Sequence, residues 1–200
     1  MKVGLAENLV RNNFIWSNIQ RSFILPFWDD LIEPPEGFIG LQIGCGRGRG
    51  TAAIFDRFNP WRLDAQDSEP LAVELAGQYL GKDYEDKIFL REGKFSSIDA
   101  ADEKYDVVFD FFNLHHSRNW RKGILEISRV LKPGGYFAFG EIYESRLTDY
   151  VTRNLLRKNS RKRFERDQLL KEMAEHRLRL LEKNHRLWGY GIIGVARKVE

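Results

Sequence analysis

The stretch Leu41-Gln42-Ile43-Gly44-Cys45-Gly46-Arg47-Gly48-Arg49-Gly50-Thr51 decides the fold, because it leads an apolar strand directly into a run of four glycines. Helical spacing of apolar residues resumes at Thr51, after the last glycine. Residues without a Cβ let backbone amides approach a bound group closely, and a helix start adds unpaired N–H donors and a partial positive charge. The turn therefore predicts a nucleotide-like ligand at the end of this strand.

Strands and helices alternate along the chain on the C-terminal side of this turn. The period of the apolar residues predicts strands at 38–43, 61–66, 87–91, 105–110 and 135–142, and helices at 49–58, 70–80 and 119–131. The strand at 105–110 has the continuous apolar centre that is typical of burial on both faces. This alternation predicts an α/β fold with a parallel sheet and helices on both faces.

The two ends of the chain follow other patterns. Residues 5–32 carry apolar side chains at helical spacing and are followed by a Pro-Pro-Glu-Gly loop at 34–37, so they predict a helical flap. Near the other end, Trp188-Gly189-Tyr190-Gly191 predicts a turn into a strand at 192–196, which makes a terminal hairpin. We therefore divide the chain into a flap (1–37), a core (38–142) and a basic helical segment with the terminal hairpin (143–200).

Length and composition favour one domain, 1–200, because 200 residues with 42% hydrophobic content suffice for one well-buried core. A single cysteine excludes an internal disulfide framework, and no Cys/His cluster has zinc spacing, so we predict no metal. The apolar stretch 23–28 contains a proline and is too short for a membrane span or a secretory signal. We therefore expect a cytoplasmic protein.

Charge is distributed unevenly along the sequence. Residues 1–150 hold 18 basic against 23 acidic side chains, whereas residues 151–200 hold 14 against 6. Most of the basic excess lies between Arg153 and Arg166. A solvated helix face explains it, and so does contact with RNA or another polyanion.

The glycine spacing discriminates between classes of nucleotide-like ligand. Dinucleotide sites show G-x-G-x-x-G, which would need glycine at 49 or 51, where Arg49 and Thr51 stand. The looser form through Gly48, Gly50 and Ala53 begins too far beyond the strand, and no Gly-Lys-Ser/Thr follows to make a phosphate loop. What remains is Gly44-x-Gly46-x-Gly48 directly after an apolar strand.

Three further stretches accompany this spacing in order: Arg62-Leu63-Asp64-Ala65-Gln66-Asp67-Ser68-Glu69-Pro70-Leu71, Tyr105-Asp106-Val107-Val108-Phe109-Asp110-Phe111-Phe112-Asn113-Leu114-His115-His116, and Arg129-Val130-Leu131-Lys132-Pro133-Gly134-Gly135. Together they resemble the class I S-adenosylmethionine-dependent methyltransferases, particularly the small type 11 group. The resemblance implies a Rossmann-like, doubly wound, mostly parallel seven-stranded sheet with an antiparallel C-terminal strand. It also implies S-adenosyl-L-methionine as cofactor, S-adenosyl-L-homocysteine as product, and in-line methyl transfer to a small-molecule acceptor.

The resemblance assigns cofactor contacts to the loop residues Gln42, Gly44, Cys45, Gly46 and Gly48. An acid at the end of the second strand holds the ribose in this family, which places Asp67 there with Ser68 beside it and Asp64 in reserve; the alternative is that Asp67 caps the next helix. Asp110 and Asn113 would line the methionine end. Two departures stand out: Gln42 replaces a frequent acid, and Gly93-Lys94-Phe95 replaces Gly-Asp-Ala, so Lys94 cannot accept a hydrogen bond from adenine and Phe95 would pack against it.

His115 and His116 are the candidate general bases, with His116 slightly favoured. Both follow the fourth strand, at the carboxyl edge where open α/β folds place ligands, and histidine exchanges protons near neutral pH. A structural role explains such a pair as well: one histidine would pack into the loop or hydrogen-bond to the backbone.

Two other functions stay open for the chain: a methyltransferase that acts on RNA or protein through residues 153–166, and a cofactor-binding protein without catalysis. The acceptor and the oligomeric state are undetermined.

Overall fold

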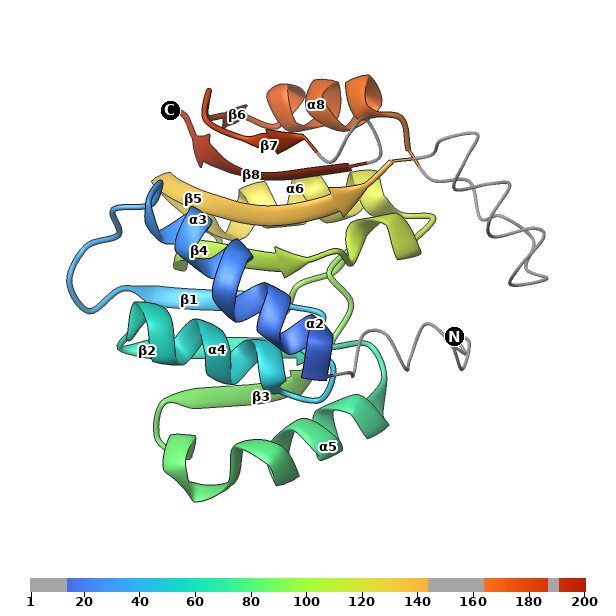
Figure 1. Cartoon of the computed structure of the whole chain (residues 1–200). Helices are drawn as coiled ribbons and strands as arrows, with labels where there is room; N and C mark the ends of the chain where they lie inside the picture. Colours follow the sequence, from blue (N-terminus) through green and yellow to red (C-terminus); the bar gives the residue numbers. More distant parts are fainter. Residues whose placement is uncertain (1–13, 144–163, 187–190) are drawn as a thin grey trace.

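The computed structural model describes residues 14–143, 164–186 and 191–200. Its strands are β1 (Ile39–Ile43), β2 (Arg62–Asp67), β3 (Ile88–Glu92), β4 (Tyr105–Phe111), β5 (Leu131–Ile142), β6 (Leu178–Leu180), β7 (His185–Arg186) and β8 (Gly191–Lys198). They form one sheet with the order β3-β2-β1-β4-β5-β8-β6, and β7 also pairs with β8 (Figure 1). The first five strands are parallel, and β8 is antiparallel to its neighbours. The predicted doubly wound sheet with a reversed C-terminal strand is confirmed.

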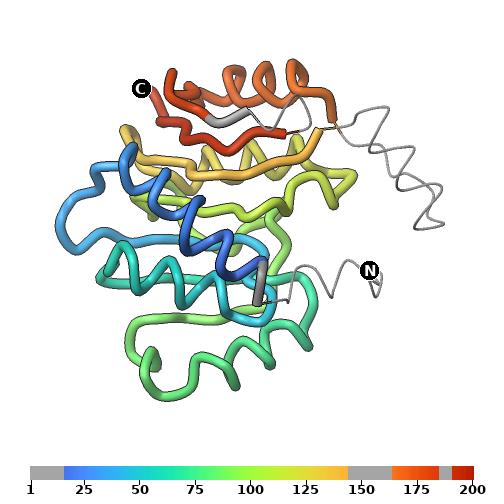
Figure 2. The backbone as a smooth tube through the Cα atoms, viewed as in Figure 1, coloured from blue at the N-terminus to red at the C-terminus, as the bar shows by residue number. Residues whose placement is uncertain are grey.

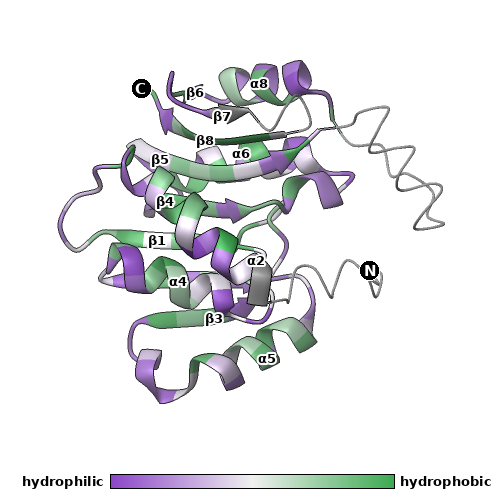
Figure 3. Ribbon diagram, in the orientation of Figure 1, coloured by the Kyte–Doolittle hydropathy of each residue, from purple (hydrophilic) through white to green (hydrophobic). Residues whose placement is uncertain are grey.

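Helices cover both faces of this sheet. They are α2 (Phe14–Ile19), the π-helix η1 (Gln20–Ile24), α3 (Leu25–Asp29), α4 (Arg49–Phe58), α5 (Pro70–Leu80), the 3₁₀ turns η2 (Gly81–Tyr84) and η3 (Leu114–His116), α6 (Trp120–Val130) and α8 (Arg166–Glu175). Apolar residues of α6 and α8 form one core with the sheet, and those of α3 and α4 form the second. Between these layers, β1 and β8 are rich in apolar residues, as their green colour in Figure 3 shows, whereas β2 carries Asp64, Gln66 and Asp67.

The described part of the N-terminal segment packs as a core layer. Pro26 lacks an N–H for the helical bond to residue 22, and the chain widens into η1 immediately before it, where the Leu25 N–H bonds to the Gln20 carbonyl. Trp28 is fully buried and stacks on Phe111 with ring centroids 4.8 Å apart. Its burial makes α3 part of the second core, and residues 1–13 of the predicted flap lie outside the described residues.

At the other end, β8 returns between β5 and β6, and the chain path is clear in Figure 2. The expected antiparallel pairing of β7 with β8 is present, while most of the basic segment, 144–163, lies outside the described residues. None of the helices within the described ranges combines the length and apolarity that crossing a bilayer requires.

Candidate active site

The loop between β1 and α4 contains three glycines with positive φ, each in a different environment. A Cβ on Gly44 would lie 2.2 Å from the Asn113 side chain, and one on Gly48 would lie 3.1 Å from the Ala76 backbone. A Cβ on Gly46 would meet no atom within 4 Å. Gly44 and Gly48 are therefore required for packing, whereas Gly46 leaves open space beside the loop.

Asp67 lies at this open position. Its Oδ2 accepts a hydrogen bond from the Gly46 N–H at 3.0 Å, and its Oδ1 accepts one from the Glu69 N–H at 3.1 Å. The carboxylate thus holds the turn before α5 and also faces the glycine loop. The capping alternative is wrong, because the N-cap of α5 is Glu69 and no side chain caps this helix. Because the side chain is only half buried, it keeps acceptor capacity for a ligand.

Asp64, the reserve for the ribose role, is committed elsewhere. Its carboxylate accepts hydrogen bonds from Arg62 and Lys104 at 2.6 Å and from the Tyr105 hydroxyl at 2.7 Å. Burial would raise the pKa of Asp64, but these three hydrogen bonds outweigh burial and hold it below its usual value. This carboxylate belongs to a structural ion-pair cluster, three residues before the carboxyl end of β2.

Asn113 and Asp110 connect the glycine loop to the end of β4. The Asn113 Nδ2 donates to the Ile43 carbonyl at 3.1 Å and to Asp110 Oδ1 at 2.7 Å. The Asn113 N–H also donates to Asp110 Oδ1, at 3.1 Å. These bonds hold the Asn113 side chain directly against Gly44, so the two predicted residues do lie beside the loop.

The two histidines follow in the turn η3. Their rings contact each other with centroids 4.0 Å apart, and His115 is buried while His116 is partly exposed. The His115 Nδ1 lies 2.8 Å from Glu141 Oε2. His115 therefore has a carboxylate partner that sequence reasoning did not supply.

Glu141 is a functional candidate that the sequence analysis missed. It is fully buried on β5, and its Oε1 accepts from the Leu114 N–H at 2.8 Å. Burial raises the pKa of Glu141 to about 7, and burial and the adjacent Glu141 charge raise the pKa of Asp110 well above its usual value. Because two buried acids that share a hydrogen bond cannot both be ionised without a large cost, the pair retains a proton near neutral pH. The one available signal was an acid inside the apolar run 136–142.

The remaining predicted residues surround the loop at different depths. Cys45 is buried and its N–H donates to the Gln66 carbonyl at 3.0 Å, while Ser68 and Lys94 are exposed. Phe95 packs on α6, where a Cβ on Gly123 would lie 2.3 Å from its ring. Gln42 is buried below the loop.

Buried polar atoms gather beneath this edge of the sheet. The Gln42 Oε1 and both amide atoms of Gln66 have no hydrogen-bond partner among the described residues. Such atoms are costly in a core and are often found at functional sites. Gln66, which sequence reasoning also missed, lies beneath Gly93 in the loop after β3.

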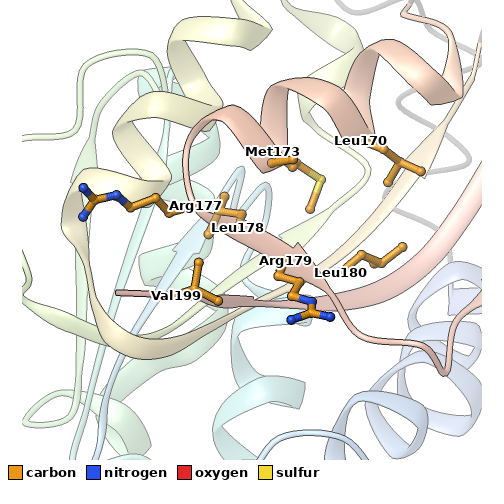
Figure 4. A pocket seen from close by; sticks show the side chains of 8 residues that line it. Leu170, Met173, Arg177, Leu178, Arg179, Leu180 and Val199 are labelled. Atoms are coloured by element: carbon orange, nitrogen blue, oxygen red, sulfur yellow. The ribbon is translucent and has the colours of Figure 1, made fainter.

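A cavity of about 400 Å³ lies elsewhere, between α8, β6 and the end of β8 (Figure 4). Its lining is mostly apolar, from side chains such as Leu170, Met173 and Leu180, with Arg177 and Arg179 beside them. It contains none of the predicted site residues. The candidate site is therefore the loop edge and not this cavity.

The architecture and the glycine loop define a class I methyltransferase fold. The sequence pattern of the family described as "Methyltransferase domain" matches residues 41–139. A probable phthiotriol/phenolphthiotriol dimycocerosates methyltransferase 2 of Mycobacterium ulcerans is 28% identical over 51% of this chain and 38% of its own length. A sterol 24-C-methyltransferase of Clavispora lusitaniae is 33% identical over 57% of this chain and 30% of its own length.

Solved structures agree in fold. A geranyl diphosphate methyltransferase in complex with SAM superposes with a TM-score of 0.77 at 15% identity, covering 97% of this chain and 90% of that one. A SAM-dependent methyltransferase from Aquifex aeolicus gives 0.74 at 16% identity, covering 99% and 100%. The chain thus contains, at residues 41–139, the methyltransferase domain that this family pattern describes, on the fold that these class I S-adenosylmethionine-dependent enzymes share. It spans about a third of the length of the curated relatives it matches.

Proposed function

We propose that this chain binds S-adenosylmethionine at the glycine loop and Asp67, and transfers its methyl group to a small, apolar acceptor. The contact of the Gly46 N–H with Asp67 at 3.0 Å carries the proposal, because it joins the loop and the ribose-binding acid beside open space. These residues fit the cofactor. The open backbone at Gly46 could receive its amino-acid half, and the Asp67 carboxylate could accept hydrogen bonds from its ribose hydroxyls. The N-terminus of α4 lies beside both and adds a partial positive charge.

The residues of this chain would bind the cofactor, support the loop or remove a proton according to where they lie in the site. Bound S-adenosylmethionine supplies an already activated methyl group, so the protein must mainly align the acceptor and exclude water. Asp67 fixes one end of the cofactor and Asn113, locked by Asp110, supports the loop at the other. His115 and His116 stand at the same sheet edge, where an acceptor hydroxyl or acidic carbon would lose its proton.

Two aromatic residues near the carboxyl edge of the sheet, Phe112 and Trp16, support an apolar acceptor. Phe112 has a φ of 63°, an unusual value for a bulky residue, and its ring packs against Gly140. Trp16 meets the Phe112 ring edge-on at 5.3 Å. Relatives named for sterol and phthiotriol substrates fit the same expectation. Phe27, Trp28 and Phe112 are buried in the second core, and Trp16 packs against this core from outside.

Calorimetry with S-adenosylhomocysteine tests the cofactor half of the proposal. Wild-type protein should bind one equivalent, and Asp67→Ala should weaken binding by about 1–3 kcal/mol, which is roughly 5- to 150-fold. Asp86→Ala, which removes an exposed acid just before β3, is the matched control and should bind like the wild type. Absence of heat and of thermal stabilisation at millimolar ligand would refute the proposal.

Transfer of labelled methyl groups tests the acceptor half. Protein incubated with methyl-labelled S-adenosylmethionine and a panel of sterols, isoprenoid alcohols and phenols should move label into the organic phase. A parallel incubation with RNA and peptide mixtures covers the macromolecular alternative. Label in the macromolecular fraction alone would overturn the small-molecule assignment.

A further inference from the structure

We propose that Glu141 is a positioning residue that fixes His115 with its proton on Nδ1, so that Nε2 is the proton-accepting nitrogen of the site. The role of His115 as a proton acceptor rests on the proposed methyl transfer, whereas its tautomer does not. Three observations carry the inference: the hydrogen-bond donors around Glu141, the neighbouring Asp110, and the charges around this pair.

The Glu141 carboxylate is surrounded by donors on the side of η3. Oε1 accepts from the Leu114 N–H at 2.8 Å, and Oε2 lies 3.3 Å from the His115 backbone N–H and 2.8 Å from its Nδ1. A carboxylate has acceptors only, so the imidazole nitrogen that faces it must carry the hydrogen. In a neutral histidine the other nitrogen then holds the lone pair.

Asp110 completes the arrangement from the neighbouring strand. It is fully buried and hydrogen-bonded to Glu141, and Asn113 donates to its Oδ1 at 2.7 Å. A protonated Asp110 that donates to Glu141 leaves the negative charge on Glu141, where it can accept the hydrogen bond from the His115 Nδ1. The same Asp110 holds Asn113 against Gly44, so one buried unit supports both the glycine loop and the histidine turn.

The surroundings of Glu141 supply no competing charge among the described residues that pack on it. β4 contributes Asp110 and η3 contributes His115, whose ring contacts the tilted ring of His116; Tyr143 follows the end of β5. The paired stretch of β8, opposite Glu141, is apolar around Ile192. Among the described residues no lysine or arginine is shown in an ion pair with Glu141, so the buried carboxylate depends on these hydrogen-bond donors, and His115 is one of them.

The Glu141→Gln substitution should move the His115 hydrogen from Nδ1 to Nε2. An amide has one acceptor oxygen, which the Leu114 N–H would occupy, and its NH₂ group would face Nδ1 as a donor. The His115 Nδ1 would then have to accept, and the hydrogen would move to Nε2. Glu172→Gln is the matched control, because Glu172, on α8, contacts His176 at 3.3 Å and Arg121 at 3.1 Å, and both of these partners lie outside η3.

Nitrogen NMR of ¹⁵N-histidine-labelled full-length protein at pH 8 reads the tautomer without cofactor or acceptor. The chain has four histidines, and His116→Asn and His176→Asn variants assist their assignment. Wild type should show His115 protonated on Nδ1, Glu141→Gln should show Nε2 protonation, and Glu172→Gln should match wild type. Wild-type His115 protonated on Nε2 would overturn the inference, and this measurement needs no variant to fold.

Binding of S-adenosylhomocysteine to the same samples separates the two proposals. Wild type that binds the ligand but carries the hydrogen on Nε2 overturns the positioning role alone. Wild type that carries it on Nδ1 but binds no ligand supports the positioning role and refutes the proposed function. A folded Glu141→Gln variant that keeps the Nδ1 hydrogen also overturns the inference.

Discussion

Substituting the three loop glycines by alanine should separate cofactor contact from packing. All three have positive φ, which costs a residue with a Cβ about 1–2 kcal/mol. At Gly46 this is the whole cost, because the new methyl group meets no atom within 4 Å. At about 2–4 °C per kcal/mol for a chain of this size, Gly46→Ala should lower Tm by about 2–8 °C.

Gly44→Ala should cost more stability. Its methyl group would lie 2.2 Å from an Asn113 side chain that is fixed by hydrogen bonds to Ile43 and Asp110. Overpacking adds about 1–3 kcal/mol to the backbone cost, so Tm should fall by about 4–20 °C. Gly48→Ala, which meets the α5 backbone at 3.1 Å, should behave similarly.

Cofactor affinity should follow a different order from stability. The methyl group of Gly46→Ala would occupy the space assigned to the cofactor, so calorimetry with S-adenosylhomocysteine should show binding weakened by roughly 5- to 150-fold, the equivalent of about 1–3 kcal/mol. The variant should nonetheless be the most stable of the three by scanning calorimetry. Wild-type affinity in Gly46→Ala would refute the reasoning, because the ligand would then bind somewhere other than the open side of the loop.

Three further outcomes are expected. The folded-state pKa of Glu141 is raised to about 7, so its contribution to stability is largest below pH 4.5 and falls by about 3 kcal/mol as the pH rises to 7. Urea unfolding of wild type and Glu141→Gln at pH 5 and pH 7.5 tests this. The stability advantage of wild type over the variant should be smaller at pH 7.5 than at pH 5, or should reverse. A pH-independent difference would contradict the raised pKa. Asp64→Ala should lower unfolding free energy by about 1–3 kcal/mol yet leave S-adenosylhomocysteine affinity unchanged, and weakened binding would return Asp64 to the ribose role. Trp28→Ala should cost about 3–5 kcal/mol in the same urea assay because it empties a fully buried volume against Phe111, and a near-neutral effect would show that α3 is not core.

Much of the fold could be predicted because local periodicity and tertiary burial agree in the central strands and helices. Helices 49–58 and 70–80 have the predicted bounds, and β4 has its expected burial on both faces. The start of β5 was misjudged: the helix was expected to continue to 131, whereas the strand begins at Leu131. Leu131 pairs with Tyr105 of β4 and so starts the strand early, whereas Lys132, Pro133 and Gly134 form an irregular stretch before pairing resumes at Tyr136.

The motifs of the site could be predicted from the sequence, but not which of their residues face the open side of the loop and which are buried. The glycine spacing located the Gly46 turn and the family resemblance placed Asp67 beside it, because strand ends at one sheet edge meet in space. Spacing cannot say which glycine faces a ligand and which faces a side chain, since that depends on Asn113. Glu141 was missed because its partners come from β4 and η3, which are 25 or more residues away in sequence.

The position of β8 has a consequence for synthesis on the ribosome. This strand pairs with β5 on one side and with β6 on the other, although β6 precedes it in the chain. A nascent chain that stalls before residue 191 would expose the long unpaired edge of β5, which is a template for intermolecular strand pairing. Translation arrest after β5 has emerged but before β8 has emerged should therefore produce aggregates, whereas arrest before β5 emerges should not create that edge.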